Sequence, residues 1–392
     1  MGSFILGVVF LLMFSGVYAQ EKDKDSAPQK AGCCPYQMPE VPMTTGYNAP
    51  ANIHVGDKGR VDVCVSASFL YWQPIQDNMG IALVQKESSV TTVPNSDLKN
   101  RFVQMHFDFV PGFKVGLGAN LRKDNWESYV EYTRVHGTHK ASSNGTSSSA
   151  PTIYVTERMQ SIFPPEMGAA ISSTSSTVTP AYETARATYR NNLDFIDAEL
   201  ARSYYAGKCL TFRTALGARS AWILQHFYRT YVVTNDPTTA RQLDVNANSN
   251  SWGIGPRVGL DMNWLLGCGF RCFGSGYGDI LYTWYKLHDK TSVTFFNPEF
   301  AEDRAGVDSN TFTTKDRQHS LKPHVDLELG FGWDTYFAKD KWHIDLSAAY
   351  GFQVFFNQNM FRHWDGLLPA WNTVPYGNLY VNGLTVTAKL DF

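Results

Sequence analysis

The sequence has few charged residues and no long hydrophobic run. Charged side chains make up 18% of its 392 residues, whereas they make up about 25% of an ordinary globular domain. The formal net charge is −2 and no cluster of Lys and Arg occurs. We therefore expect no nucleic-acid partner, because such binding requires a basic excess. Beyond the first residues, no segment reaches ~18 consecutive apolar positions, which excludes a transmembrane helix.

Compact catalytic motifs are missing as well. The chain has no Gly-x-Ser-x-Gly, no phosphate-binding loop and no His-Glu-x-x-His. His324-x-Asp326-x-Glu328 offers three ligand types on one strand face, but alternate strand positions are ~7 Å apart, too far for one ion to bind all three. We predict no enzyme, no cofactor and no metal site. An enzyme with scattered catalytic residues is the distant alternative.

The N-terminal residues have the pattern of a secretion signal. The apolar run 4–14 is too short to span a bilayer, and Val17 and Ala19 stand at the −3 and −1 positions before Gln20. The run is not preceded by Lys or Arg, so a buried N-terminal helix is the alternative. We predict a signal peptide over 1–19 and a flexible periplasmic lead-in, rich in Pro, Gly and Asn, over 20–60.

Aromatic residues are abundant, at 14% of the chain, and apolar and polar residues alternate from residue 61 onward. In 252–264 every even position is apolar, from Trp252 to Trp264, and every odd position is Gly, Arg, Asp or Asn. A period of two indicates a strand with one apolar face. Ten segments show this pattern: 61–72, 113–121, 126–133, 193–205, 210–219, 252–264, 269–286, 325–334, 342–351 and 384–392.

The connections between these segments alternate between short and long. Short turns are expected at 122–125, 206–208, 265–268 and 338–340, and long loops at 74–104, 137–190, 223–249, 288–317 and 358–375. Tight periplasmic turns alternating with long extracellular loops are typical of membrane β-barrels. Further strands within 74–104, and at 152–158 and 181–189, would raise the count above ten.

Three features favour a membrane barrel over a secreted β-sandwich or propeller. The strands exceed the ~5–6 residues usual in soluble sheets, and aromatic residues cluster at strand ends, as they do at membrane interfaces. Glycines share the parity of the polar face: Gly116, Gly118, Gly253, Gly255, Gly259, Gly330 and Gly332. We predict an all-β, antiparallel transmembrane β-barrel over 61–392, with about 10–12 strands and sixteen as the upper limit.

The last ten residues alternate up to the carboxyl terminus. Leu384, Val386, Ala388, Leu390 and Phe392 are apolar, and the residues between them are polar or small. A barrel must leave no open edge. We therefore predict that this segment pairs with the strand that starts at Val61, with its apolar residues facing lipid.

Several segments resemble the major outer membrane protein family of legionella-type and chlamydia-related bacteria. They are 193–205 (LDFIDAELARSYY), 210–213, 216–223, 252–260 (WGIGPRVGL) and 378–384. The resemblance implies a dominant outer-membrane barrel that acts as a general porin and as a surface antigen or adhesin. It also implies that the C-terminal Phe392 is an assembly signal for the barrel-insertion machinery. Thr214 and Ala215 depart from the family's proline-histidine pair, so pore selectivity does not transfer.

Parity places several charged residues in the lumen, where charge sets selectivity. Lys114, Arg213, Arg219 and Arg257 are predicted to line the pore, together with Asp326, Glu328, Asp334 and Asp345. The three arginines lie on two neighbouring strands and the four acids on another pair. We expect two well-separated walls with a transverse field between them. The alternative is that these residues only fill a wet lumen.

All six cysteines fall at or near the predicted periplasmic rim: Cys33, Cys34, Cys64, Cys209, Cys268 and Cys272. An oxidising compartment permits disulfides, but adjacent cysteines cannot easily pair with each other. We expect Cys33 and Cys34 to pair with other rim cysteines or with cysteine-containing envelope proteins. Internal staples and ordinary thiols are the alternatives.

The leading functional prediction is an outer-membrane porin that passes small hydrophilic solutes by diffusion and is a major surface protein. The alternative is a disulfide-linked structural protein or adhesin whose long loops, 74–104 and 137–190, contact host cells. The expected partners are outer-membrane lipid, the insertion machinery, a second copy of the chain, envelope proteins and the host-cell surface.

Overall fold

The structure is a computed structural model, and the residues it describes all belong to one compact unit within 40–392. These residues are 49–56, 61–87, 99–122, 125–144, 156–161, 184–233, 240–296, 307–361 and 377–392. The predicted signal peptide and most of the predicted lead-in lie outside them. Among the described residues, no helix has the length and apolar character needed to cross a membrane.

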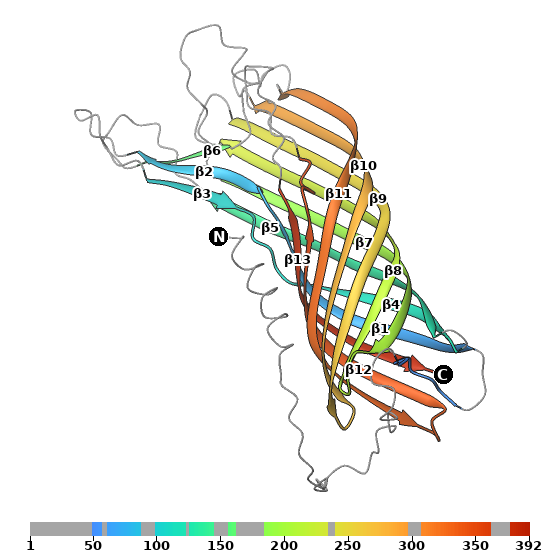
Figure 1. The fold of residues 1–392 in the computed structure, drawn as a ribbon. Coiled ribbons are helices and arrows are strands. Elements are labelled where there is room, and N and C mark those ends of the chain that lie inside the picture. Colours follow the sequence, from blue (N-terminus) through green and yellow to red (C-terminus); the bar gives the residue numbers. More distant parts are fainter. Residues whose placement is uncertain are drawn as a thin grey trace. The chain divides into compact units, whose positions relative to one another are not determined.

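Ten antiparallel strands form a closed barrel in the order β1-β13-β12-β11-β10-β9-β8-β7-β5-β4 (Figure 1). The predicted all-β transmembrane barrel fold is confirmed, and each of the ten predicted segments contributes one strand. The strands are β1 (Val61–Gln76), β4 (Val110–Leu121), β5 (Trp126–Asn144), β7 (Thr184–Tyr205), β8 (Leu210–Val233), β9 (Ala240–Gly267), β10 (Phe270–Phe296), β11 (Val307–Phe337), β12 (Trp342–Phe355) and β13 (Leu379–Asp391).

The barrel closes where its first and last strands meet. β1 pairs with β13 from Cys64 opposite Asp391 to Gln76 opposite Leu379. The backbone N–H of Phe392 donates to the carbonyl of Val63 at 2.9 Å, and the N–H of Val63 donates back at 3.0 Å. The predicted pairing of the C-terminal segment is therefore confirmed.

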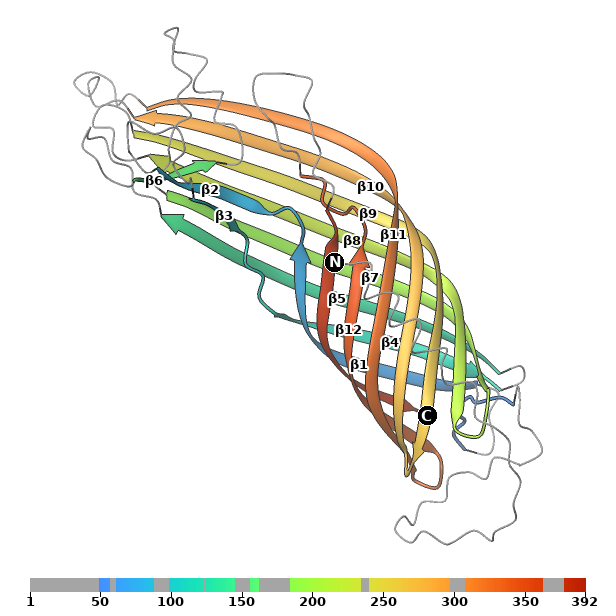
Figure 2. The same ribbon diagram turned by 60° about the vertical axis from the view of Figure 1, so that its left-hand side comes forward.

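Three further strands form a separate sheet in the order β3-β2-β6. They are β2 (Gly80–Glu87), β3 (Lys99–Gln104) and β6 (Thr156–Ser161). The strands expected within 74–104 and near 152–158 thus pair with one another and add none to the barrel, because the ten-strand ladder has no free edge. The expected strand at 181–189 is the beginning of β7. This sheet lies at the end of the barrel opposite to the C-terminus (Figures 1 and 2).

The barrel strands are longer than the alternation predicts, and β11 reaches 31 residues. The loops expected at 223–249 and 288–317 are wrong over most of their length, because β8, β9, β10 and β11 run through them. The reason lies in a reversal of the pattern above Trp252. Leu243, Val245 and Ala247 face inward and are buried, so the outward positions there are polar Asn and Asp. In the sequence, a strand with apolar residues facing inward and polar residues facing outward is hard to distinguish from a polar loop.

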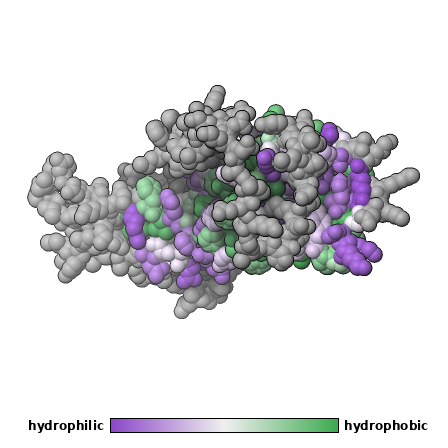
Figure 3. All heavy atoms as spheres, turned by 60° about the horizontal axis from the view of Figure 1, so that its bottom comes forward, coloured by the Kyte–Doolittle hydropathy of each residue, from purple (hydrophilic) through white to green (hydrophobic). Residues whose placement is uncertain are grey.

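The outward face below this reversal is apolar. In β1, Phe69 is 55% exposed whereas the next residue, Leu70, is fully buried. Trp252 on β9 stacks on Trp284 on β10 with ring centroids 4.5 Å apart, which matches an aromatic girdle at a membrane interface. On the face drawn in Figure 3, hydrophobic residues gather between two hydrophilic groups. An exposed apolar surface of this extent needs to be covered by lipid. A bilayer is spanned by ~9–11 residues of each strand, so the remaining residues of the longer strands lie outside it.

The connections identify the two ends of the barrel. Short connections follow β4, β7, β9 and β11, as predicted, and long ones follow β1, β5 and β12. By the rule for outer-membrane barrels, the short-turn end faces the periplasm and the other end faces outward.

Candidate functional site

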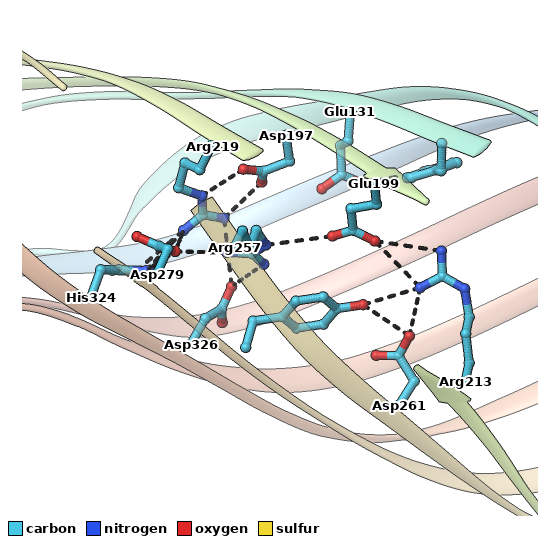
Figure 4. A network of polar contacts seen from close by, with 12 residues as sticks. Glu131, Asp197, Glu199, Arg213, Arg219, Arg257, Asp261, Asp279, His324 and Asp326 are labelled. Carbon is cyan, nitrogen blue, oxygen red and sulfur yellow. Dashed lines mark hydrogen bonds and ion pairs between the residues drawn. The ribbon is translucent and has the colours of Figure 1, made fainter. Parts of the chain in front are cut away.

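The candidate site is a cluster of ionised side chains inside the barrel, drawn in Figure 4. We call it the lumen network. Inward parity on six neighbouring strands supplies its members, and it includes all three predicted arginines and one of the four predicted acids. Its residues are Asp197 and Glu199 on β7, Arg213 and Arg219 on β8, Arg257 and Asp261 on β9, Tyr277 and Asp279 on β10, His324 and Asp326 on β11, and Glu127 on β5.

Arg219 anchors the network. It lies directly opposite Asp197 on the neighbouring strand, and its guanidinium forms two parallel bonds to that carboxylate, at 2.6 and 2.7 Å. Such bidentate pairs combine charge with fixed geometry. The same guanidinium reaches the His324 ring at 3.1 Å, so it spans from β8 to β11.

Arg257 joins the acids of three strands. Its guanidinium lies 3.1 Å from Asp279, 3.4 Å from Glu199 and 3.4 Å from Asp326. It also stacks over the Tyr277 ring at 4.2 Å. Asp279 in turn lies 2.8 Å from Nδ1 of His324, which gives this buried carboxylate a second partner.

These contacts correct the prediction of two separated walls. Asp326 lies 3.8 Å from Arg219 and 3.4 Å from Arg257, so one predicted acid forms ion pairs with two of the predicted arginines and the two groups are not well separated. A barrel of about eight strands has an interior that side chains fill, and ten strands remain narrow enough for arginines to reach β11. The Asp279 and His324 side chains are 0% exposed, which shows a packed lumen at this level.

Arg213 extends the network toward the periplasmic end. It donates to Glu127 at 2.7 Å, to Asp261 at 2.8 Å and to the Tyr277 hydroxyl at 3.1 Å. Glu199 lies 3.3 Å from it and so links it to Arg257. Sequence parity already marked Glu127, Glu199 and Asp261 as inward, but their role as partners depends on the register between strands.

The remaining predicted pore residues belong to other groups. Lys114 on β4 pairs with Glu131 at 3.3 Å and lies over the Trp72 ring. Glu328 has the inward parity of β11 and makes no ion pair with any described residue.

Asp334 and Asp345 form a separate cluster near the periplasmic end. Arg271 lies 2.6 Å from Asp345 and 3.8 Å from Asp334. His343 bridges Asp334, at 3.1 Å, and Asp391, at 2.9 Å. This cluster ties β11 and β12 to the C-terminal strand, and it contains none of the three predicted arginines.

Residues 49–56, which belong to the predicted lead-in, are bound at the periplasmic mouth. The Tyr205 N–H donates to Ala49 at 2.9 Å, and the Gly56 N–H donates to Asp340 at 2.6 Å. Arg122 donates to the carbonyls of Val55 and Gly56, and its guanidinium pairs with Asp62 at 2.7 Å. This segment therefore runs from the β7 end to the β11–β12 turn.

Above the lumen network the interior becomes largely apolar. One cluster draws buried side chains from seven barrel strands, including Trp72, Phe195 and Phe355. A second cluster nearer the outer end packs Ile81 and Val84 of β2 against Tyr231 of β8. Between them, Gln225 donates to Gln76 at 2.7 Å and to Tyr189 at 2.8 Å. Most of the buried ion pairs thus lie toward the periplasm and most of the apolar packing toward the outside, although Arg229 and Lys322 are also buried in the outer half.

The described cysteines lie at the ends of strands. Cys64, Cys209 and Cys272 are free thiols, of which Cys64 is buried and Cys209 exposed. Cys268 occupies the short turn between β9 and β10. Cys33 and Cys34 lie outside the described residues, so their pairing stays a prediction.

Comparison with solved structures returns proteins of low similarity. The outer membrane protease OmpT of Escherichia coli has 10% identity and a TM-score of 0.33, covering 84% of this chain and 96% of its own. The Pseudomonas putida toluene transporter TodX has 8% identity and a TM-score of 0.22, covering 86% and 90%. A Pseudomonas aeruginosa FadL homologue has 7% identity and a TM-score of 0.21, covering 85% and 90%. No curated protein sequence matches the chain.

Comparison with protein families gives a match over most of the chain. The family described as Legionella pneumophila major outer membrane protein precursor matches residues 60–392, which include every strand of the closed barrel. The chain therefore belongs to the Legionella major outer membrane protein family and is a β-barrel of the bacterial outer membrane.

Proposed function

We propose that this barrel passes small hydrophilic solutes and ions by diffusion and that the lumen network is its constriction. The observation that carries the proposal is the burial of so many ionised groups inside a membrane protein. Buried charges are costly to desolvate even when paired, and ionisable residues at membrane depth usually mark a solute or ion pathway. A purely structural barrel could fill this level with apolar side chains, as the apolar cluster above it does.

The packed lumen implies that passage requires the network to open. The long Arg219 side chain is the main bridge between β8 and β11, through His324 and Asp326. Movement of this side chain would leave Arg257 as the remaining bridge between the two sides of the constriction. We therefore propose a small conductance with brief openings rather than a permanently wide pore.

Planar-bilayer recording of the purified protein tests this proposal. Arg219→Ala should raise single-channel conductance or open probability several-fold, and it should shift selectivity toward cations, because the carboxylates then lose a counter-charge. Arg202→Ala is the matched control. Arg202 is exposed on β7 and makes no ion pair among the described residues, so its removal should leave conductance unchanged. Folded protein that never conducts, in either form, would refute the proposal.

A second candidate is a structural and adhesive role at the cell surface. Strands β8 to β11 extend beyond the aromatic girdle, where many of their outward residues are polar. In the β3-β2-β6 sheet, the Phe102 side chain is 66% exposed. The exposed Cys209 would suit cross-linking to envelope proteins. Absence of conductance in the same recordings would favour this role, which is compatible with the first.

A further inference from the structure

Basic side chains gather on the outward face of β10 and β11, at and above the level of the aromatic girdle. We call this group the basic patch: Lys286, His288 and Lys290 on β10, and Lys315, Arg317 and His319 on β11. Five of the six are exposed, and His288 is half-buried. The described outward positions between them carry no carboxylate, because Asp289 and Asp316 have inward parity.

The cross-strand register sets basic residues against each other. Lys286 lies directly opposite Arg317, and His288 lies directly opposite Lys315. Like charges in opposed positions destabilise a β-ladder. None of the six side chains makes an ion pair with a described residue, so the described part of the chain leaves this repulsion uncompensated. An anion held between the two strands would remove it.

The girdle fixes the level of the basic patch in the membrane. Trp284 lies opposite Trp252 on one side and opposite His319 on the other. Below it the outward face is apolar, with Ile280 and Leu321 54% and 63% exposed. Aromatic belts lie at the head-group level, and this is the outer end of the barrel. The basic patch therefore faces the head groups of the outer leaflet.

We propose that the basic patch binds the phosphate groups of an anionic lipid of the outer leaflet. Arg317 supplies the planar fork that suits phosphate, and the lysines supply point charges. Asn250 and Asn248 on β9 lie opposite Lys286 and His288 and add amide donors at the edge of the patch. The acyl chains of the same lipid pack on the apolar face below the girdle, so charge and hydrocarbon are recognised together.

Native mass spectrometry of the detergent-solubilised, folded barrel tests this site, with purified lipopolysaccharide as the probe. Lys286→Gln combined with Arg317→Gln should weaken binding by about tenfold or more, because each basic residue at a membrane surface contributes to anionic-lipid affinity. Lys286→Arg keeps the positive charge and should keep binding intact. It therefore distinguishes loss of charge from disruption of the strand as the cause of weaker binding. Dephosphorylated lipopolysaccharide should bind the unmodified protein as weakly as intact lipid binds the double variant.

A matched control removes two outward charges elsewhere on the barrel. Lys140 on β5 and Arg190 on β7 are exposed, and each lies opposite a threonine in the β5–β7 ladder. On its other side Arg190 lies opposite His226, so neither residue faces a Lys or Arg across that pairing. Lys140→Gln combined with Arg190→Gln should leave most of the binding. Equal losses in the two double variants would show diffuse attraction and overturn the proposal. So would equal binding of dephosphorylated lipid, or complete displacement by millimolar inorganic phosphate, which would indicate a free-anion site.

Discussion

Among single residues, glycine decides whether the lumen network can form. Gly259 on β9 lies opposite Tyr277 on β10, and a Cβ atom there would lie 2.1 Å from the tyrosine ring. The ring therefore covers the glycine, which places its hydroxyl 2.9 Å from Asp261 and 3.1 Å from Arg213. The inward parity of the glycines thus makes room for aromatic side chains that hold the arginines.

Gly259→Ala should displace Tyr277 and destabilise the barrel by about 1–3 kcal/mol, the usual cost of overpacking. The measurement is the urea midpoint of unfolding, followed by loss of the heat-modifiable folded band. Gly276→Ala is the control, since its Cβ would meet only the flexible end of Leu327 at 3.4 Å. A Gly259→Ala midpoint equal to that of the control would contradict this account.

Among the strands, β13 carries the contacts that close the barrel. Its neighbours are β1 and β12, and Asp391 at its end is held by His343 and by Lys389 at 3.3 Å. The Phe392 ring is 47% exposed and lies 5.5 Å from the Trp342 ring. The C-terminus therefore combines a backbone seam with an aromatic group on the lipid side.

Deleting Phe392 should reduce membrane insertion far more than removing one residue from 20–48. The deletion removes both the exposed ring and the two hydrogen bonds to Val63, whereas Phe392→Ala removes only the ring and should have an intermediate effect. Pulse-labelling followed by membrane fractionation measures the inserted fraction. If the deletion and the lead-in trim insert equally well, the C-terminal Phe is no assembly signal.

At the scale of the whole barrel, closure brings β1 and β13, which are far apart in the sequence, side by side. Ser68 lies opposite Thr387, and their hydroxyl oxygens are 2.8 Å apart. Directly opposed residues in an antiparallel ladder have Cα atoms ~4.5–5.5 Å apart, within the range of a disulfide. The closed ladder can therefore be trapped covalently.

Ser68→Cys combined with Thr387→Cys should form a disulfide on mild oxidation of the folded protein, detected by peptide mass spectrometry. All six native cysteines are replaced by Ser in this background to prevent exchange. The control, Ser68→Cys with Thr385→Cys, places the thiols one diagonal step apart, ~7–8 Å, and should stay reduced. Oxidation of the control instead would place the seam in a different register.

The alternation of residues was sufficient to predict the strands, their lipid-facing side and the closure of the ladder. The strands and their lipid-facing side follow from the environment of one strand, because hydrocarbon outside and polar groups inside impose a period of two. Closure follows because a sheet in hydrocarbon can leave no open edge. The same reasoning misplaced the loops at 223–249 and 288–317. Beyond the girdle the barrel is surrounded by a polar environment, so outward residues are polar and inward residues are apolar. The alternation is then opposite to that in the membrane and is harder to recognise.

The amino-acid sequence alone determines the barrel, the inward and outward positions along each strand, and the inward position of Arg213, Arg219 and Arg257. Their partners follow only from the tertiary structure. Asp279 and His324 meet Arg219 because a ten-strand wall is narrow and the register brings these residues to one level. Likewise, Lys286 and Arg317 become opposed only through the β10–β11 register. A period of two within one strand states which way a side chain points, but it carries no information on what stands across the lumen or on the next strand.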